Sequence, residues 1–313
     1  AKSGMPGVVH VDFPKNILPN PIDVESTDLS LKGGAHSVAL ANRPRPETWA
    51  VEQAADLLMQ AERPVIIAGR GVRWANASPQ LIALAERLTV PVITTEMGRG
   101  SIPEDHPLAG GIVGHFGHST ANGLVREADL VLGLGSRFLN VNTINWSLIS
   151  ENAKIVQVEN DPLEIGKQSA VTLGVHADSG AFLDDLLARL DADGLQVEGG
   201  ADHPRVKRVA ELAADQERRY YDTDLDAVPI KPQRITKAIE QVCEPDAIYV
   251  LGSGLHTQWA HGIKIRKPDQ YHLPVGSGTM AWALPGAIGA KLAQPDRQVV
   301  VCIGDGDFGM NAQ

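Results

Sequence analysis

Short apolar runs alternate with segments of helical periodicity along most of the chain. In residues 47–62, ETWAVEQAADLLMQAE, apolar side chains recur at helical spacing, which predicts an amphipathic helix. The next run, RPVIIAG, is short and β-branched, as is typical of a buried strand. Because this alternation continues to about residue 192, the pattern predicts an α/β domain in which helices cover a parallel sheet.

The other elements of this region follow the same rule. Strands are also expected in VPVITT, DLVLGLG, AKIVQVE and VTLGV, and helices in SPQLIALAERL, STANGLVREA, PLEIGKQ and SGAFLDDLLARL. Ser78 is a candidate N-cap, with Pro79 in the first turn. Ligands of parallel sheets bind beyond the carboxyl ends of the strands, so the loops of interest are 69–71, 95–100, 133–137 and 159–161.

A second α/β pattern begins after a charged helix in HPRVKRVAELAADQERRYYD. It contains the expected helices IKPQRITKAIEQV and MAWALPGAIGAKLA and the expected strands AIYVLGSG, QYHLPVG and QVVVCIG. The loops after these strands, 252–256, 276–280 and 304–310, are expected to lie on one edge of one sheet.

These patterns predict the domain organisation. We expect the end of one domain at 1–18 (with a strand at 8–12), a Pro- and Gly-rich linker at 19–46, a central domain at 47–192, a bridging segment at 193–229 and part of a further domain at 230–313. The chain opens without Met on a strand and closes on a strand and loop with no following helix. We therefore expect it to be an excerpt of a longer polypeptide.

The amino-acid composition excludes some classes of partner and cellular location. The net charge of −10, from 28 basic and 38 acidic residues, argues against nucleic acid or a membrane surface as partner. No apolar stretch approaches the roughly 20 residues needed to span a bilayer, and no export signal is visible, so we expect a cytoplasmic protein. The two cysteines, Cys243 and Cys302, have no metal-site spacing and are expected in the core.

The last loop carries the most informative chemistry. Gly304, Gly306 and Gly309 have G-x-G-x-x-G spacing, which lets backbone N–H groups face a diphosphate. Asp305 lies between the first two glycines. Two like charges about 4 Å apart repel by several kcal/mol, whereas Mg²⁺ is held by carboxylates together with phosphate oxygens. A metal–diphosphate site is therefore favoured over a plain surface turn or a bare dinucleotide loop.

Several motifs in order resemble those of the thiamine-diphosphate-dependent enzymes, above all the acetolactate synthase large subunit. GDGDFGMN resembles the start of their diphosphate signature, GSGLHTQWA their GxGQHxxWA segment, and GSGTMAWALPGAIGAKLAQPDR their GxGTMGxxLPAAIGA segment. RPVIIAGRGVRWANAS, ADLVLGLGSRF and AKIVQVENDPLEIGK follow their middle domain, and GMPGVVHVDFPKNIL the end of their pyrimidine-binding domain. The resemblance implies parallel-sheet three-layer α/β/α domains with a central Rossmann-like, sirtuin-like domain.

The resemblance implies how the diphosphate is held. Asp305 is expected to bind Mg²⁺, and the backbone at Gly304, Gly306 and Asp307 is expected to cradle the thiamine diphosphate. His256, beside Gly254, is expected to donate to the diphosphate. The alternative for His256 is an ordinary histidine at a helix start or on the surface.

Other matches concern the pyrimidine ring. Gly278 and Met280 correspond to the Gly and Met beside the aminopyrimidine, where the Met forces the two cofactor rings together. The alternative is a core Met at the start of a helix. Leu255 stands where the family usually has Gln, so one polar contact is expected to be missing.

The resemblance also implies an activity, namely decarboxylation of a 2-oxo acid and carboligation of the product. The family's activating Glu is expected upstream of Ala1 and a second metal-ligating Asn beyond Gln313, so the chain alone is expected to be inactive. Family active sites lie between subunits, which implies a homodimer or homotetramer, and a regulatory subunit is a further expected partner. The alternatives are a 2-oxo acid decarboxylase, a sulfoacetaldehyde acetyltransferase-like enzyme or a non-catalytic nucleotide-binding module.

FAD is an open question for the central domain. Many acetolactate synthases carry it there, and Gly69, Gly71, Gly135 and Arg137 lie in loops that fit a nucleotide. However, the family's GxRFDDRVTG reads GSRFLNVNTINW here, so the paired acids are lost, which argues against FAD. The alternative for Arg137 is a surface ion pair.

Overall fold

The computed structural model describes residues 12, 16, 21, 43–274 and 278–312. The chain divides into two units, Ala1–Pro44 and Arg45–Gln313. All helices and strands of the described residues lie in the second unit. The strand expected at 8–12 and nearly all of the expected linker at 19–46 lie outside the described residues.

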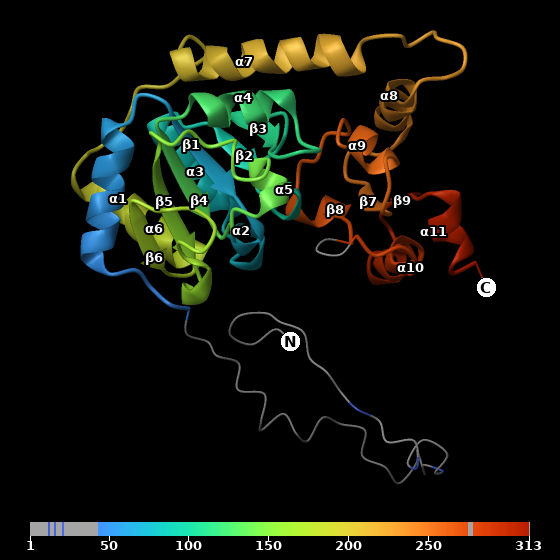
Figure 1. The fold of residues 1–313 in the computed structure, drawn as a ribbon, viewed down its shortest axis with the longest axis horizontal. Helices are drawn as coiled ribbons and strands as arrows, with labels where there is room; N and C mark the ends of the chain where they lie inside the picture. The colour runs from blue at the N-terminus through green and yellow to red at the C-terminus, as the bar shows by residue number, and fades with distance from the viewer. Residues whose placement is uncertain (1–11, 13–15, 17–20, 22–42, 275–277, 313) are drawn as a thin grey trace. The chain divides into compact units, whose positions relative to one another are not determined.

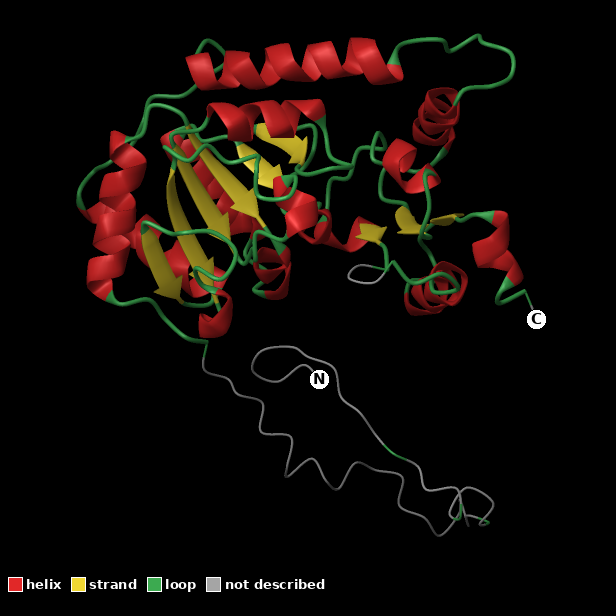
Figure 2. Ribbon diagram, viewed as in Figure 1, coloured by secondary structure: helices red, strands yellow, loops and turns green. Residues whose placement is uncertain are grey.

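The first sheet has six strands in the order β3-β2-β1-β4-β5-β6, and every neighbouring pair is parallel (Figure 2). The strands are β1 Pro64–Ala68, β2 Val92–Thr94, β3 Ala109–Ile112, β4 Leu130–Leu134, β5 Lys154–Glu159 and β6 Leu173–His176. Ile66 of β1 is in register with Val92 on one side and Leu132 on the other. The strand order reverses between β1 and β4, and ligands of such sheets bind at this position.

Helices cover both faces of this sheet (Figure 1). They are α1 Thr48–Gln60, α2 Arg70–Trp74, α3 Ser78–Leu88, α4 Ser119–Glu127, α5 Asn140–Thr143, α6 Ser179–Ala192 and α7 Pro204–Gln216, with one-turn η2 Glu96–Gly98 and η3 Pro162–Glu164. One apolar cluster joins β-strand residues to Leu58, Leu84 and Leu186 of α1, α3 and α6. A second joins the other face to Val125 of α4 and Val209 of α7. The predicted three-layer α/β/α fold is confirmed.

The charged helix expected after residue 200 forms α7 and continues into a π-helical turn, η4 Glu217–Tyr221. Leu212 of α7 lies over Gly123 of α4, where a side chain on the glycine would come within 3.3 Å of a leucine methyl group. Arg205 donates hydrogen bonds to the carbonyls of Ala61 and Leu88. These contacts attach α7 to the helical layer of the first sheet.

The second sheet contains β7 Ile248–Leu251, β8 Tyr271–His272 and β9 Val299–Cys302, all parallel, in the order β8-β7-β9. Its helices are α8 Pro232–Val242, α9 His256–Ala260, η5 Pro268–Gln270, α10 Ala283–Ala293 and α11 Asp305–Gly309. One face packs on α8 and α9, with the free thiols of Cys243 and Cys302 at the edge of the cluster, and the other packs on α10. Because the strands are parallel, the described parts of the loops that follow them lie on the same edge, as predicted.

Some expectations for individual elements were wrong. Ser78 is the first residue of α3 rather than its cap, because Ala77 holds the cap position. PLEIGKQ forms only the single turn η3, which Asp161 caps by accepting from the Leu163 N–H. The strand β3 was not predicted, because its sequence AGGI has two glycines and little β propensity. Among the described residues, every helix is too short or too polar to cross a membrane.

Candidate functional site

The loops after β7, β8 and β9 contact one another at the carboxyl edge of the second sheet. A Cβ added to Gly278 would lie 3.2 Å from Oγ of Ser253, so the second loop rests on the first. A Cβ on Gly306 would lie 3.4 Å from Cε of Met280, so the second loop also rests on the third. The structure therefore brings together the described residues that the sequence singled out in three separate motifs.

The third loop leaves open space beside its backbone. A Cβ at Gly304 or Gly309 would meet no atom within 4 Å. Contrary to the expectation that no helix follows the last strand, residues 305–309 of this loop form the short helix α11, and the N–H groups of a first helical turn point along the axis towards any anion placed there. This backbone can accommodate a diphosphate.

Asp305 stands at the entrance of this loop with an exposed side chain. Its Oδ1 accepts the N–H of Gly306 at 2.9 Å. No group of three or more His, Cys, Asp or Glu in the described part of the chain could hold a metal ion. A cation at Asp305 therefore needs oxygens from a ligand, which is how Mg²⁺ is commonly held beside phosphates.

His256 is the first residue of α9, and its ring lies against the loop backbone. A Cβ on Gly254 would come within 2.9 Å of the His256 Nδ1 atom. The Nε2 atom is buried and has no hydrogen-bond partner. Buried polar atoms are usually paired, so an oxygen from a ligand would satisfy this nitrogen. The neighbouring Leu255 is 77% exposed and offers no polar contact.

The nucleotide-site residues of the first sheet have a packing explanation. A Cβ on Gly69 would lie 2.1 Å from the carbonyl oxygen of Gly135, and a Cβ on Gly71 would lie 2.6 Å from the Gly135 Cα. The glycines thus permit two loops to touch where the strand order reverses. Arg137 lies 4.0 Å from the carboxylates of both Asp161 and Glu164, which fits its alternative as a surface ion pair.

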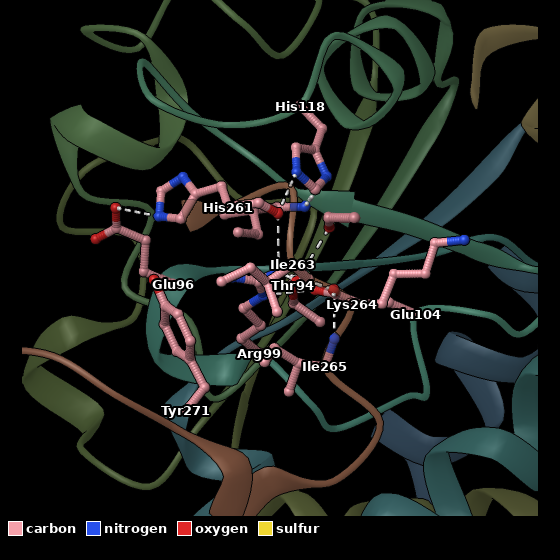
Figure 3. Close-up of polar contacts among 12 residues, drawn as sticks. Thr94, Glu96, Arg99, Glu104, His118, His261, Ile263, Lys264, Ile265 and Tyr271 are labelled. Carbon is pink, nitrogen blue, oxygen red and sulfur yellow. Dashed lines mark hydrogen bonds and ion pairs between the residues drawn. The ribbon is translucent and has the colours of Figure 1, made fainter. Parts of the chain in front are cut away.

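The sequence did not reveal a buried polar network centred on Arg99, which joins loops of the two sheets (Figure 3). The fully buried guanidinium of Arg99 pairs with Glu104 through two hydrogen bonds, of 2.6 and 2.8 Å. It also donates to the carbonyls of His261 and Ile263 and lies 4.6 Å from the ring centre of Tyr271. Arg99 falls in the predicted ligand loop 95–100, but no sequence pattern indicated its partners more than 150 positions away.

The same network shifts the pKa of His261. Burial and the charge of Arg99 lower the pKa of His261 to about 3, so this ring is neutral at pH 7. Its Nδ1–H donates to the Phe116 carbonyl at 2.8 Å, and Nε2 faces the Glu96 carboxylate at 3.8 Å. Burial raises the pKa of Glu96. These groups connect loops of the two sheets, and their contacts indicate a structural role.

Comparison with known proteins gives the family. Residues 51–186 match the central domain of thiamine pyrophosphate enzymes, and residues 252–313 match their C-terminal, thiamine pyrophosphate-binding domain. The chain belongs to the thiamine pyrophosphate enzymes. The match to the C-terminal domain begins in the first of the three converging loops and includes the other two.

Curated relatives match this member of the thiamine pyrophosphate enzymes over 98–100% of its length. It is 37% identical to a probable acetolactate synthase large subunit of Methanocaldococcus jannaschii, over 100% of this chain and 53% of the relative. It is 34% identical to the acetolactate synthase large subunit of Corynebacterium glutamicum (100% and 49%) and 35% identical to glyoxylate carboligase of Escherichia coli O157:H7 (98% and 50%). The chain spans about half the length of the curated relatives that it matches.

Proposed function

We propose that this chain supplies the central and diphosphate-binding domains of an enzyme that decarboxylates a 2-oxo acid and joins the product to a second carbonyl compound. The observation that carries this proposal is the convergence of the loops containing His256, Met280 and Asp305 on one sheet edge. The similarity to acetolactate synthases and to a glyoxylate carboligase supports carboligation rather than simple decarboxylation.

Each residue of the three loops is proposed to hold a different part of the cofactor. The N–H groups at Gly306 and Asp307 would face the diphosphate, His256 Nε2 would bond one of its oxygens, and Asp305 would hold Mg²⁺ against it. Gly278 and Met280 would lie beside the aminopyrimidine. Bound thiamine diphosphate supplies the electron sink for loss of CO₂, and the protein supplies position and electrostatics.

Cofactor binding tests this proposal directly. Calorimetric titration of the active enzyme with thiamine diphosphate should give saturable binding with Mg²⁺ and none with EDTA. Asp305→Ala should remove the Mg²⁺-dependent binding, because the cation loses its protein carboxylate and the diphosphate its bridge. The control Asp296→Ala changes an exposed acid outside these loops and should bind as the unmodified protein does. Binding that ignores both EDTA and Asp305→Ala would contradict the metal assignment.

Two substrates are favoured by the relatives. Pyruvate is suggested by the acetolactate synthases and glyoxylate by the carboligase. We propose pyruvate first, because both acetolactate synthases named above match the chain over its full length. Incubating the active enzyme with either acid and identifying products by mass spectrometry separates the two. Release of free aldehyde without a joined product would favour a plain 2-oxo acid decarboxylase.

The proposal also covers the oligomeric state of the protein and the binding of FAD. We expect homodimers or homotetramers, and the large-subunit relatives support a search for a regulatory subunit. Light scattering and affinity purification test these points. FAD in the central domain stays a prediction, and the contacts of Arg137 with Asp161 and Glu164 weigh against it. A flavin absorption spectrum of the purified protein would support FAD.

A further inference from the structure

Ala281 holds an unusual backbone conformation next to Met280. Its φ angle is +68°, in the left-handed region that residues with a Cβ seldom adopt. Such a conformation persists only where the surroundings hold it in place. Ala281 connects the second loop of the site to the start of α10, so its conformation decides where the preceding Met280 lies.

Two side chains from residues 307–311 bond the backbone of Ala281. The Asp307 carboxylate accepts the Ala281 N–H through Oδ1 at 2.5 Å. Asn311, one turn further along, donates from Nδ2 to the Ala281 carbonyl. Both backbone hydrogen-bonding groups of this strained residue are thus satisfied by one short segment.

The other oxygen of Asp307 reaches the first loop. Oδ2 accepts the N–H of Ser253 at 3.3 Å, and a Cβ on Gly252 would lie only 2.1 Å from that oxygen. Asp307 is 1% exposed, and its carboxylate accepts from the backbone N–H groups of Ser253 and Ala281. A buried carboxylate stabilised by backbone N–H groups has its position fixed by them, so Asp307 ties all three loops together.

We propose that Asp307 and Asn311 are positioning residues that clamp Ala281 and thereby place Met280 against Gly306. The sequence assigned only a backbone role to Asp307 and none to Asn311. The clamp needs no ligand. The effect of the clamp on the aminopyrimidine rests on the proposed function, because the position of Met280 matters for the cofactor only if thiamine diphosphate binds at this site.

Hydrogen exchange of the cofactor-free protein tests the clamp. Asp307→Asn keeps the shape but replaces one acceptor oxygen with an N–H₂ group facing a backbone donor. We expect exchange at Ser253 or Ala281 to accelerate about tenfold or more, since charge-assisted bonds are the stronger ones. Exchange in β7 and β9 should not change, which separates a local clamp from general destabilisation. Asp296→Asn, an exposed acid, is the matched control. Unchanged exchange at both loop sites in Asp307→Asn would overturn the proposal.

A steric test uses Gly252. Gly252→Ala should displace the Asp307 carboxylate and accelerate exchange in the same two loops, because the new methyl group overlaps Oδ2. In an Asp307→Ala background the overlap disappears, so adding Gly252→Ala should have little further effect. Equal effects of Gly252→Ala in the two backgrounds would show that the carboxylate does not fill this place.

An activity measurement extends the test to the cofactor. In the active enzyme, Asp307→Asn should lower kcat about tenfold with little change in KM for the 2-oxo acid, because a displaced Met280 affects the cofactor and not the substrate pocket. A change confined to KM would contradict this step. If thiamine diphosphate does not bind at all, the proposed function fails while the exchange results still decide the clamp.

Discussion

At the residue scale, His261 shows how burial fixes a protonation state. Its ring is 1% exposed and lies near the buried guanidinium of Arg99 and the partly buried ring of His118. Burial lowers the pKa of His118 as well. A proton on His261 would add charge to a site that already holds a cation, so the folded protein excludes it. The Nδ1–H donor to the Phe116 carbonyl fixes the tautomer and leaves Nε2 without a proton.

This environment predicts a pH dependence of stability. Between the ordinary pKa of His, about 6.5, and the folded value of about 3, the unfolded chain binds a proton that the folded protein excludes. The free energy of unfolding should therefore fall as the pH drops below 6.5, by up to about 1.4 kcal/mol per pH unit. Burial raises the pKa of Glu96, so protonation of this carboxyl favours the folded protein. As the pH falls through its titration range, Glu96 therefore increases the free energy of unfolding and opposes the effect of His261.

The variant His261→Asn isolates this contribution. Asn can keep the donor to Phe116 but has no titrating ring. Urea unfolding at pH 7.5, 6.5 and 5.5 should give a shallower decline in stability for the variant than for the unmodified protein. Parallel declines would mean that His261 is not the source of the slope.

At the scale of elements, periodicity predicted the alternation of strands and helices but not every boundary. Long amphipathic segments such as α1 and α6 were foreseen because their apolar faces repeat over several turns. β3 was missed because Gly110 and Gly111 are held by tertiary contacts; Gly111, for example, has a φ of +85° and lies against His118. The motif loops were located correctly because each follows a short apolar run that forms a strand, whereas the side-chain role of Asp307 depends on partners that only the fold brings close.

The contact between the loops after β1 and β4 predicts a steric effect on stability. Gly69→Ala places a methyl group 2.1 Å from the Gly135 carbonyl oxygen, and a backbone atom cannot rotate away. We expect a loss of about 1–3 kcal/mol in the free energy of unfolding, as for other overpacked sites. Gly289→Ala, in helix α10 with open space around it, should instead gain about 0.5–1 kcal/mol. Chemical denaturation measures both, and a neutral Gly69→Ala would contradict the packing account.

At the scale of the whole Arg45–Gln313 unit, the two sheets are joined through groups that are costly to bury separately. Glu104 accepts the N–H of Ile265 through its side chain and also bonds the Ile265 carbonyl through its own N–H, each at 2.9 Å. His118 contacts the His261 carbonyl at 3.0 Å through Nε2. With the two donations from Arg99, the backbone carbonyls of His261, Ile263 and Ile265 all accept hydrogen bonds from residues of the first sheet's loops.

The Arg99–Glu104 pair should therefore control whether the two sheets unfold together. Arg99→Met leaves the Glu104 carboxylate buried and unpaired, and breaking a buried ion pair in this way costs about 3–5 kcal/mol. We expect calorimetry of the 313-residue protein to show one transition for the Arg45–Gln313 unit, and Arg99→Met to separate an early transition for the second sheet. The double variant Arg99→Met/Glu104→Leu removes both charges, so no buried charge is left without a partner. It should therefore recover part of the lost free energy of unfolding. If the single and double variants melt together in one unshifted transition, the pair does not couple the sheets, and the smaller contacts of Arg73 with the Tyr271 and Pro268 carbonyls must do so instead.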